Sequence, residues 1–109
     1  MDFSVMRKKI KTLSFDVLRT DCDNFFEGVV IKDELKKLNA QLKNFLGEPV
    51  YPSKDRLSRL VWKVVDGFGG ITPGQTLYYK SLGNDSIFAM LCPWQDGVRT
   101  TLKIIQKYP

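Results

Sequence analysis

The sequence predicts an α+β fold, in which an antiparallel sheet of four to five strands has two main helices packed on one face. Three observations lead to this prediction. Three apolar, alternating segments separated by turn residues close the chain, two amphipathic segments precede them, and a length of 109 residues matches one domain. We therefore expect residues 1–109 to form a single small domain.

The N-terminal region fits either a helix or a strand. Phe3, Met6 and Ile10 have helical spacing, whereas apolar and polar residues alternate from Leu13 onward. We expect a short helical or irregular start, then a strand over about 11–19 that pairs with a second strand over 25–31. The alternative is one long helix over residues 3–18, and it leads to a different function.

Two amphipathic helices are expected in the middle of the chain. Leucines at spacings of three and four predict a helix over 33–46, which ends because Gly47 favours a left-handed backbone and Pro49 prevents continuation. A second apolar stripe predicts a helix over 54–66, with Ser53 as its N-cap. Both helices are expected to bury their stripes on a common sheet.

The C-terminal third predicts an antiparallel meander. Its strands are expected over 76–82, 86–92 and 99–107, with turns at 83–85 and 95–97. The middle strand is apolar on both faces and is therefore expected to be central and covered on each side. Helices on one face alone would leave the other face in water, so a partner protein, a second copy of the chain or the N-terminal segment is expected to cover it.

The glycine-rich segment 66–75 suggests a phosphate loop, but its position argues against one. Phosphate loops follow a strand and open a helix, so that free N–H groups face the anion. Here a helix precedes the loop and presents its carbonyl end to it. We interpret Gly67, Gly69 and Gly70 as helix-cap and turn residues.

The composition argues against catalysis and against a cofactor. The chain has no histidine, which removes the commonest general base near neutral pH and the commonest transition-metal ligand. Its two cysteines, Cys22 and Cys92, are too few for a metal site or a disulfide framework. We expect no catalytic residues, no metal and no cofactor.

The location expected from the sequence is the cytoplasm. The first residues lack the apolar core of a signal peptide, and no apolar stretch approaches the roughly 20 residues that cross a bilayer. Reduced thiols are the expected state of both cysteines. No association with a membrane is expected.

The favoured function is a non-catalytic binding or protein-interaction domain with an aromatic-lined apolar surface. Aromatic side chains are enriched at such surfaces because they bury a large area. The partner would be a protein or a small ligand, or a second copy of the chain that packs on an apolar sheet face. The candidate contact residues are Trp62, Tyr78, Tyr79 and Trp94.

The less favoured function is nucleic-acid binding through a winged-helix arrangement. A helix over residues 3–18 would give the element order of that fold, and the net charge of +5 suits an acidic partner. The long connection 47–53 and the apolar character of 86–94 count against it. The candidate phosphate contacts are Arg7, Lys8 and Lys9 in the N-terminal segment and Arg56, Arg59 and Lys63 on the second helix.

Overall fold

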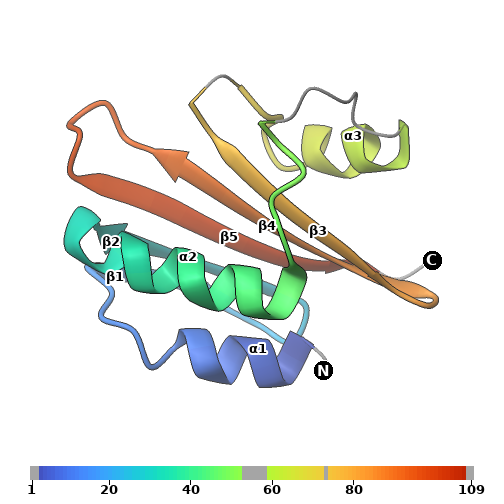
Figure 1. Ribbon diagram of the computed structural model, residues 1–109, viewed down its shortest axis with the longest axis horizontal. Helices are drawn as coiled ribbons and strands as arrows, with labels where there is room; N and C mark the ends of the chain where they lie inside the picture. The colour runs from blue at the N-terminus through green and yellow to red at the C-terminus, as the bar shows by residue number, and fades with distance from the viewer. Residues whose placement is uncertain (1–2, 53–58, 73, 108–109) are drawn as a thin grey trace.

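The computed structural model describes residues 3–52, 59–72 and 74–107. Eight elements follow one another within these ranges (Figure 1). They are α1 (Phe3–Ile10), β1 (Val17–Asp21), β2 (Phe25–Ile31), α2 (Lys32–Leu46), α3 (Arg59–Asp66), β3 (Thr76–Leu82), β4 (Asp85–Pro93) and β5 (Arg99–Lys107). None of the helices in these ranges is long and apolar enough to cross a membrane.

The strands form one five-stranded sheet in the order β1-β2-β5-β4-β3, and every neighbouring pair is antiparallel. The predicted α+β class and its antiparallel sheet are therefore confirmed. The predicted strands 25–31, 76–82 and 99–107 coincide with β2, β3 and β5, and β4 exceeds the predicted 86–92 by one residue at each end. The C-terminal meander is joined to the N-terminal hairpin because every residue of β2 pairs with β5.

The N-terminal segment contains both a helix and a strand. The helix α1 ends at Ile10, and β1 begins at Val17 rather than near residue 11. The strand starts later than expected because the intervening Leu13 and Phe15 pack against the core as the chain crosses from the helix to the sheet edge. The alternative of one helix over residues 3–18 is not adopted, so the element order of a winged helix is not formed.

One face of the sheet is covered by α1 and α2, which lie side by side in Figure 1. The buried side chains of α1 are Phe3, Met6 and Ile10, and they join the leucines of α2 in one apolar cluster. The sheet contributes alternate residues of its strands to this cluster, because successive side chains of a strand point to opposite faces. These residues are Phe26, Val30, Tyr78, Ile87, Ala89, Leu91, Leu102 and Ile104.

The opposite face is covered by α3 (Figure 1). The helix buries Val61 and Val65 against a second cluster that includes Phe88 and Met90 of β4. The helix that shares a face of the sheet with α2 is therefore α1. The sequence instead predicts that the helices over 33–46 and 54–66 pack on the same face. Because β4 is apolar on both faces, either face offers a site for an amphipathic helix. The start of the predicted second helix, including its Ser53 cap, lies outside the described residues.

Glycines with a positive φ follow α2 and α3. Gly47 follows α2 with a φ of 81°, which side-chain-bearing residues rarely adopt, and its N–H donates to the carbonyl of Lys43 at 2.9 Å. After α3, Gly70 has a φ of 75° and its N–H donates to the carbonyl of Val65 at 2.8 Å. The capping and turn role predicted for the glycine-rich segment is therefore confirmed at Gly70.

Candidate functional site: a groove beneath α3

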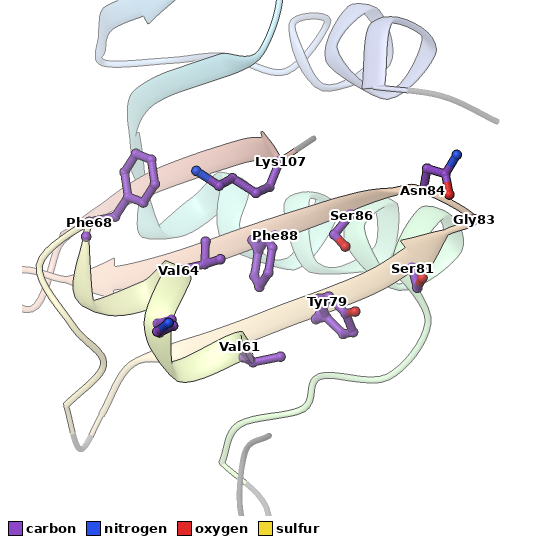
Figure 2. A pocket seen from close by; sticks show the side chains of 12 residues that line it. Val61, Val64, Phe68, Tyr79, Ser81, Gly83, Asn84, Ser86, Phe88 and Lys107 are labelled. Carbon is purple, nitrogen blue, oxygen red and sulfur yellow. The ribbon is translucent and has the colours of Figure 1, made fainter. Parts of the chain in front are cut away.

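A groove of about 800 Å³ opens between α3 and the strands β3, β4 and β5. Figure 2 shows Val61 and Val64 of α3 on one side of it, and Tyr79 and Phe88 on two neighbouring strands. Its apolar lining consists of Val61, Val64, Phe68, Tyr79 and Phe88. Its polar lining consists of Lys63, Ser81, Asn84, Ser86 and Lys107, with Gly67 and Gly83 completing the wall.

The floor of the groove follows from the register of the β3–β4 hairpin. Tyr79 and Phe88 are directly paired across the two strands, and their ring centroids lie 4.9 Å apart. The next pair on the same face is Ser81 with Ser86. This face of the hairpin therefore changes from aromatic to hydroxyl-bearing side chains two residues closer to the turn.

The roof of the groove is fixed at its C-terminal end. The Phe68 ring stacks on Phe25 of β2, with the ring centroids 5.6 Å apart. The Lys103 ammonium group donates a hydrogen bond of 3.2 Å to the Phe68 carbonyl oxygen. These contacts hold the end of α3 over the sheet, and the groove opens beyond them.

The groove is positively charged. Lys63 of α3 and Lys107 of β5 line it, and no aspartate or glutamate is among the lining residues that the structure describes. Within the described parts of the chain, neither lysine forms an ion pair. Within these parts of the chain, the charges of the two lysines are therefore not neutralised by an ion pair with a carboxylate.

The four predicted contact residues lie in different places. Tyr79 lines the groove, while Trp62 is 43% exposed on α3 and is not part of the lining. Tyr78 is 1% exposed, points to the opposite face and donates a hydrogen bond to Asn39 of α2. Of the four residues, the structure brings only Tyr79 into the groove, and Trp94 belongs to a separate surface.

Trp94 lies at the end of the sheet where β4 leads into β5, and it is 37% exposed. Its indole N–H donates a 2.8 Å hydrogen bond to the Thr101 hydroxyl, and the guanidinium carbons of Arg19 and Arg99 each lie 5.7 Å from its ring centroid. Asp16 and Asp96 form ion pairs with Arg99. This surface is therefore electrically balanced, unlike the groove.

The described residues among those proposed for nucleic-acid contact do not form one surface. Arg7 forms ion pairs with Asp21 and Asp23, whereas Lys8 and Lys9 are exposed. Arg59 and Lys63 belong to α3, which covers the other face of the sheet from α1. Arg56 lies outside the described residues.

The Cys92 thiol is not activated as a nucleophile. Burial raises the pKa of the Cys92 thiol, although the nearby charge of Lys103 lowers it. A thiol with a raised pKa is protonated near neutral pH and is a weak nucleophile. Across residues 3–52, 59–72 and 74–107, no group of three or more cysteines and carboxylates is placed to hold a metal ion.

Sequence reasoning missed most of the groove. The valines and Phe68 were assigned to the hydrophobic core, and Lys63 was considered only as a phosphate contact. The signal present in the sequence was the step from Tyr79 to Ser81 on β3, mirrored by the step from Phe88 to Ser86 on β4.

Comparison of the chain with protein-family models, curated proteins and solved structures found no match. The function is therefore argued from the geometry of the groove.

Proposed function

We propose that this protein is a small non-catalytic binding domain that holds an apolar ligand in the groove beneath α3. The observation that carries the proposal is an open groove of about 800 Å³ between α3 and the sheet, with Val61, Val64, Phe68, Tyr79 and Phe88 in its lining. Ligand sites commonly have volumes of about 300–1,000 Å³, with a mostly apolar lining and a few polar groups. The paired rings of Tyr79 and Phe88 supply such a lining.

The polar groups of the groove support binding rather than catalysis. A catalytic nucleophile is activated by a base within hydrogen-bond distance, and that base is usually held by a third group. None of the hydrogen bonds within the described chain joins two polar side chains of the groove. The proposal therefore assigns these groups to orienting a ligand. It also places the protein in the cytoplasm, which the two free cysteines support.

A neutral apolar probe tests the proposal. N-phenyl-1-naphthylamine becomes strongly fluorescent in apolar surroundings, so we expect saturable binding with a stoichiometry of about one. In ¹H–¹⁵N NMR spectra, the amide signals that shift should be those of Val64, Tyr79 and Phe88. Absence of saturable binding would remove the proposal.

A blocking variant locates the probe. Ser81→Trp places a large side chain in the groove from an exposed position of β3, so binding should be lost while the far-ultraviolet circular dichroism is kept. Lys80→Trp is the matched control, because the neighbouring residue of the strand points to the other face. Equal binding by both variants would show that the probe binds elsewhere.

A further inference from the structure

Polar side chains cross the groove in a single row. Ser81, Ser86 and Lys107 are successive Cα partners on β3, β4 and β5. Two hydroxyls and an ammonium group therefore stand on one sheet face, next to one another. All three can donate a hydrogen bond to an oxygen of a ligand.

An apolar row lies beside it. Tyr79, Phe88 and Ile105 are Cα partners on the same three strands, two residues before or after the polar row. Residues two apart on a strand are separated by roughly 7 Å. The groove thus offers a ligand an aromatic surface and, about one ring width away, a set of hydrogen-bond donors.

The charge of the groove decides which polar group fits. Lys63 approaches from α3 and Lys107 from β5, and the described residues of the lining include no carboxylate that would attract a cation. A partly enclosed pair of positive charges favours an anion over a neutral group of the same size. A carboxylate also accepts hydrogen bonds from hydroxyls such as those of Ser81 and Ser86.

We infer that the ligand is a small amphipathic carboxylate. Its carboxylate binds Lys63, Lys107 and the serine hydroxyls, and its hydrocarbon or aromatic part lies over Tyr79 and Phe88. This inference rests on the proposed function and names the class of ligand for the same groove. The volume of about 800 Å³ suits a small molecule rather than a folded partner.

The test compares two ligands that differ only in their head group. Binding of decanoate and of 1-decanol is measured by calorimetry or NMR at low ionic strength, below the concentrations at which either associates with itself. We expect decanoate to bind about fivefold more tightly than decanol, since two exposed lysines each contribute modestly. Added salt should reduce this preference because it screens the charges.

Two double variants assign the effect. Lys63→Gln/Lys107→Gln should abolish the preference for decanoate over decanol, so the ratio of the two affinities should fall to about one. Lys36→Gln/Lys80→Gln removes the same charge from exposed lysines outside the groove and should keep the preference. Persistence of the preference in the first variant would overturn the inference.

The outcomes also separate this inference from the proposed function. If N-phenyl-1-naphthylamine binds in the groove but decanoate has no advantage over decanol, the carboxylate inference fails and the groove remains a ligand site. If neither the neutral probe nor either decyl ligand binds, both fail together.

Discussion

The Tyr78 hydroxyl donates a 2.9 Å hydrogen bond to the side-chain oxygen of Asn39 and thereby joins β3 to α2. Burial raises the pKa of Tyr78 above its ordinary value, so the phenol keeps its proton at neutral pH. The residue therefore contributes to the core on the face opposite the groove, although its sequence neighbour Tyr79 lines the groove.

Removal of this hydroxyl should lower stability without affecting ligand binding. Tyr78→Phe deletes one hydrogen bond and leaves the Asn39 side chain without its partner, so the free energy of unfolding should fall by about 0.5–1.5 kcal/mol. Urea unfolding measures this change in the free energy of unfolding. Tyr79→Phe is the matched control, since its hydroxyl makes no hydrogen bond within the described chain. Equal stability of Tyr78→Phe and the natural protein would contradict the assignment.

A side chain at position 28 should destabilise the sheet. A Cβ on Gly28 would lie 2.8 Å from a ring carbon of Phe15, which is closer than carbon atoms approach one another. The Phe15 ring also packs edge-on against Phe26, with centroids 5.5 Å apart, so it cannot move away freely. Gly28→Ala should therefore lower the free energy of unfolding by about 1–3 kcal/mol.

The partner variant tests whether Phe15 causes this loss. Phe15→Leu is expected to destabilise the protein on its own. Adding Gly28→Ala to this variant should lower the free energy of unfolding by less than Gly28→Ala does in the natural sequence. Additive losses in the double variant would show that the contact with Phe15 is not responsible.

Asp21 should make stability depend on acid pH. A 2.6 Å hydrogen bond from Lys11, helped by the nearby charge of Arg7, lowers the pKa of Asp21 in the folded protein. The unfolded chain therefore takes up this proton first as the pH falls, and the stabilisation present at neutral pH is lost from about pH 4 downward. Asp21→Asn should show a smaller decrease in stability between about pH 5 and pH 3 in urea titrations.

The control for this effect is an aspartate without such partners. Asp66 is exposed and forms no ion pair within the described residues, so Asp66→Asn should keep the acid-induced decrease of the natural protein. If Asp66→Asn reduced the acid-induced decrease in stability as much as Asp21→Asn does, Asp21 would not be the cause of that decrease.

The contact between Trp94 and Thr101 should appear as a coupling energy. The Thr101 side chain is buried, and Trp94→Phe would leave its hydroxyl without the indole donor, at a cost of about 1 kcal/mol. In a double-mutant cycle with Thr101→Val, the two losses should be less than additive. Trp62→Phe, at an exposed position, should change stability little. Strict additivity of the two variants would argue against the hydrogen bond in solution.

The two thiols should react at very different rates. Cys22 is exposed, whereas Cys92 is half-buried and its pKa is raised by burial. A thiol reagent such as 5,5′-dithiobis(2-nitrobenzoic acid) should therefore modify Cys22 quickly and Cys92 only slowly at neutral pH. Cys22→Ser should remove the fast phase, and urea should accelerate the slow one. A fast phase that survives in Cys22→Ser would show that Cys92 is accessible.

The strands β2, β3 and β5 and the helix over 33–46 could be predicted because the sequence patterns that mark them are local. Alternation, turn glycines and leucine spacing mark β2, β3, β5 and α2 almost to the residue. The face that α3 covers could not be predicted, since the apolar stripe of a helix fits either apolar face of β4. Strand alternation also implies that Tyr78 and Tyr79 point to opposite faces, so only one of these two predicted contact residues can line a given site.

The candidate site was predictable only in part. The pairing of Tyr79 with Phe88, and of Ser81 with Ser86, follows from a hairpin that turns at Gly83 and Asn84. The roof of the groove depends on how α3 crosses the sheet and on the stacking of Phe68 over Phe25, which are contacts between distant parts of the chain. Lys107 joins the site because β5 pairs with β4, and no local pattern places it there.

The central position of β5 also sets the order in which the protein can assemble during synthesis. The hairpin of β1 and β2 and the hairpin of β3 and β4 leave the ribosome first, each with an edge that lacks its final neighbour. Pairings between distant segments form slowly, and open strand edges invite association with other chains. Only the pairing of residues 99–107 with both β2 and β4 turns these two open edges into interior strands.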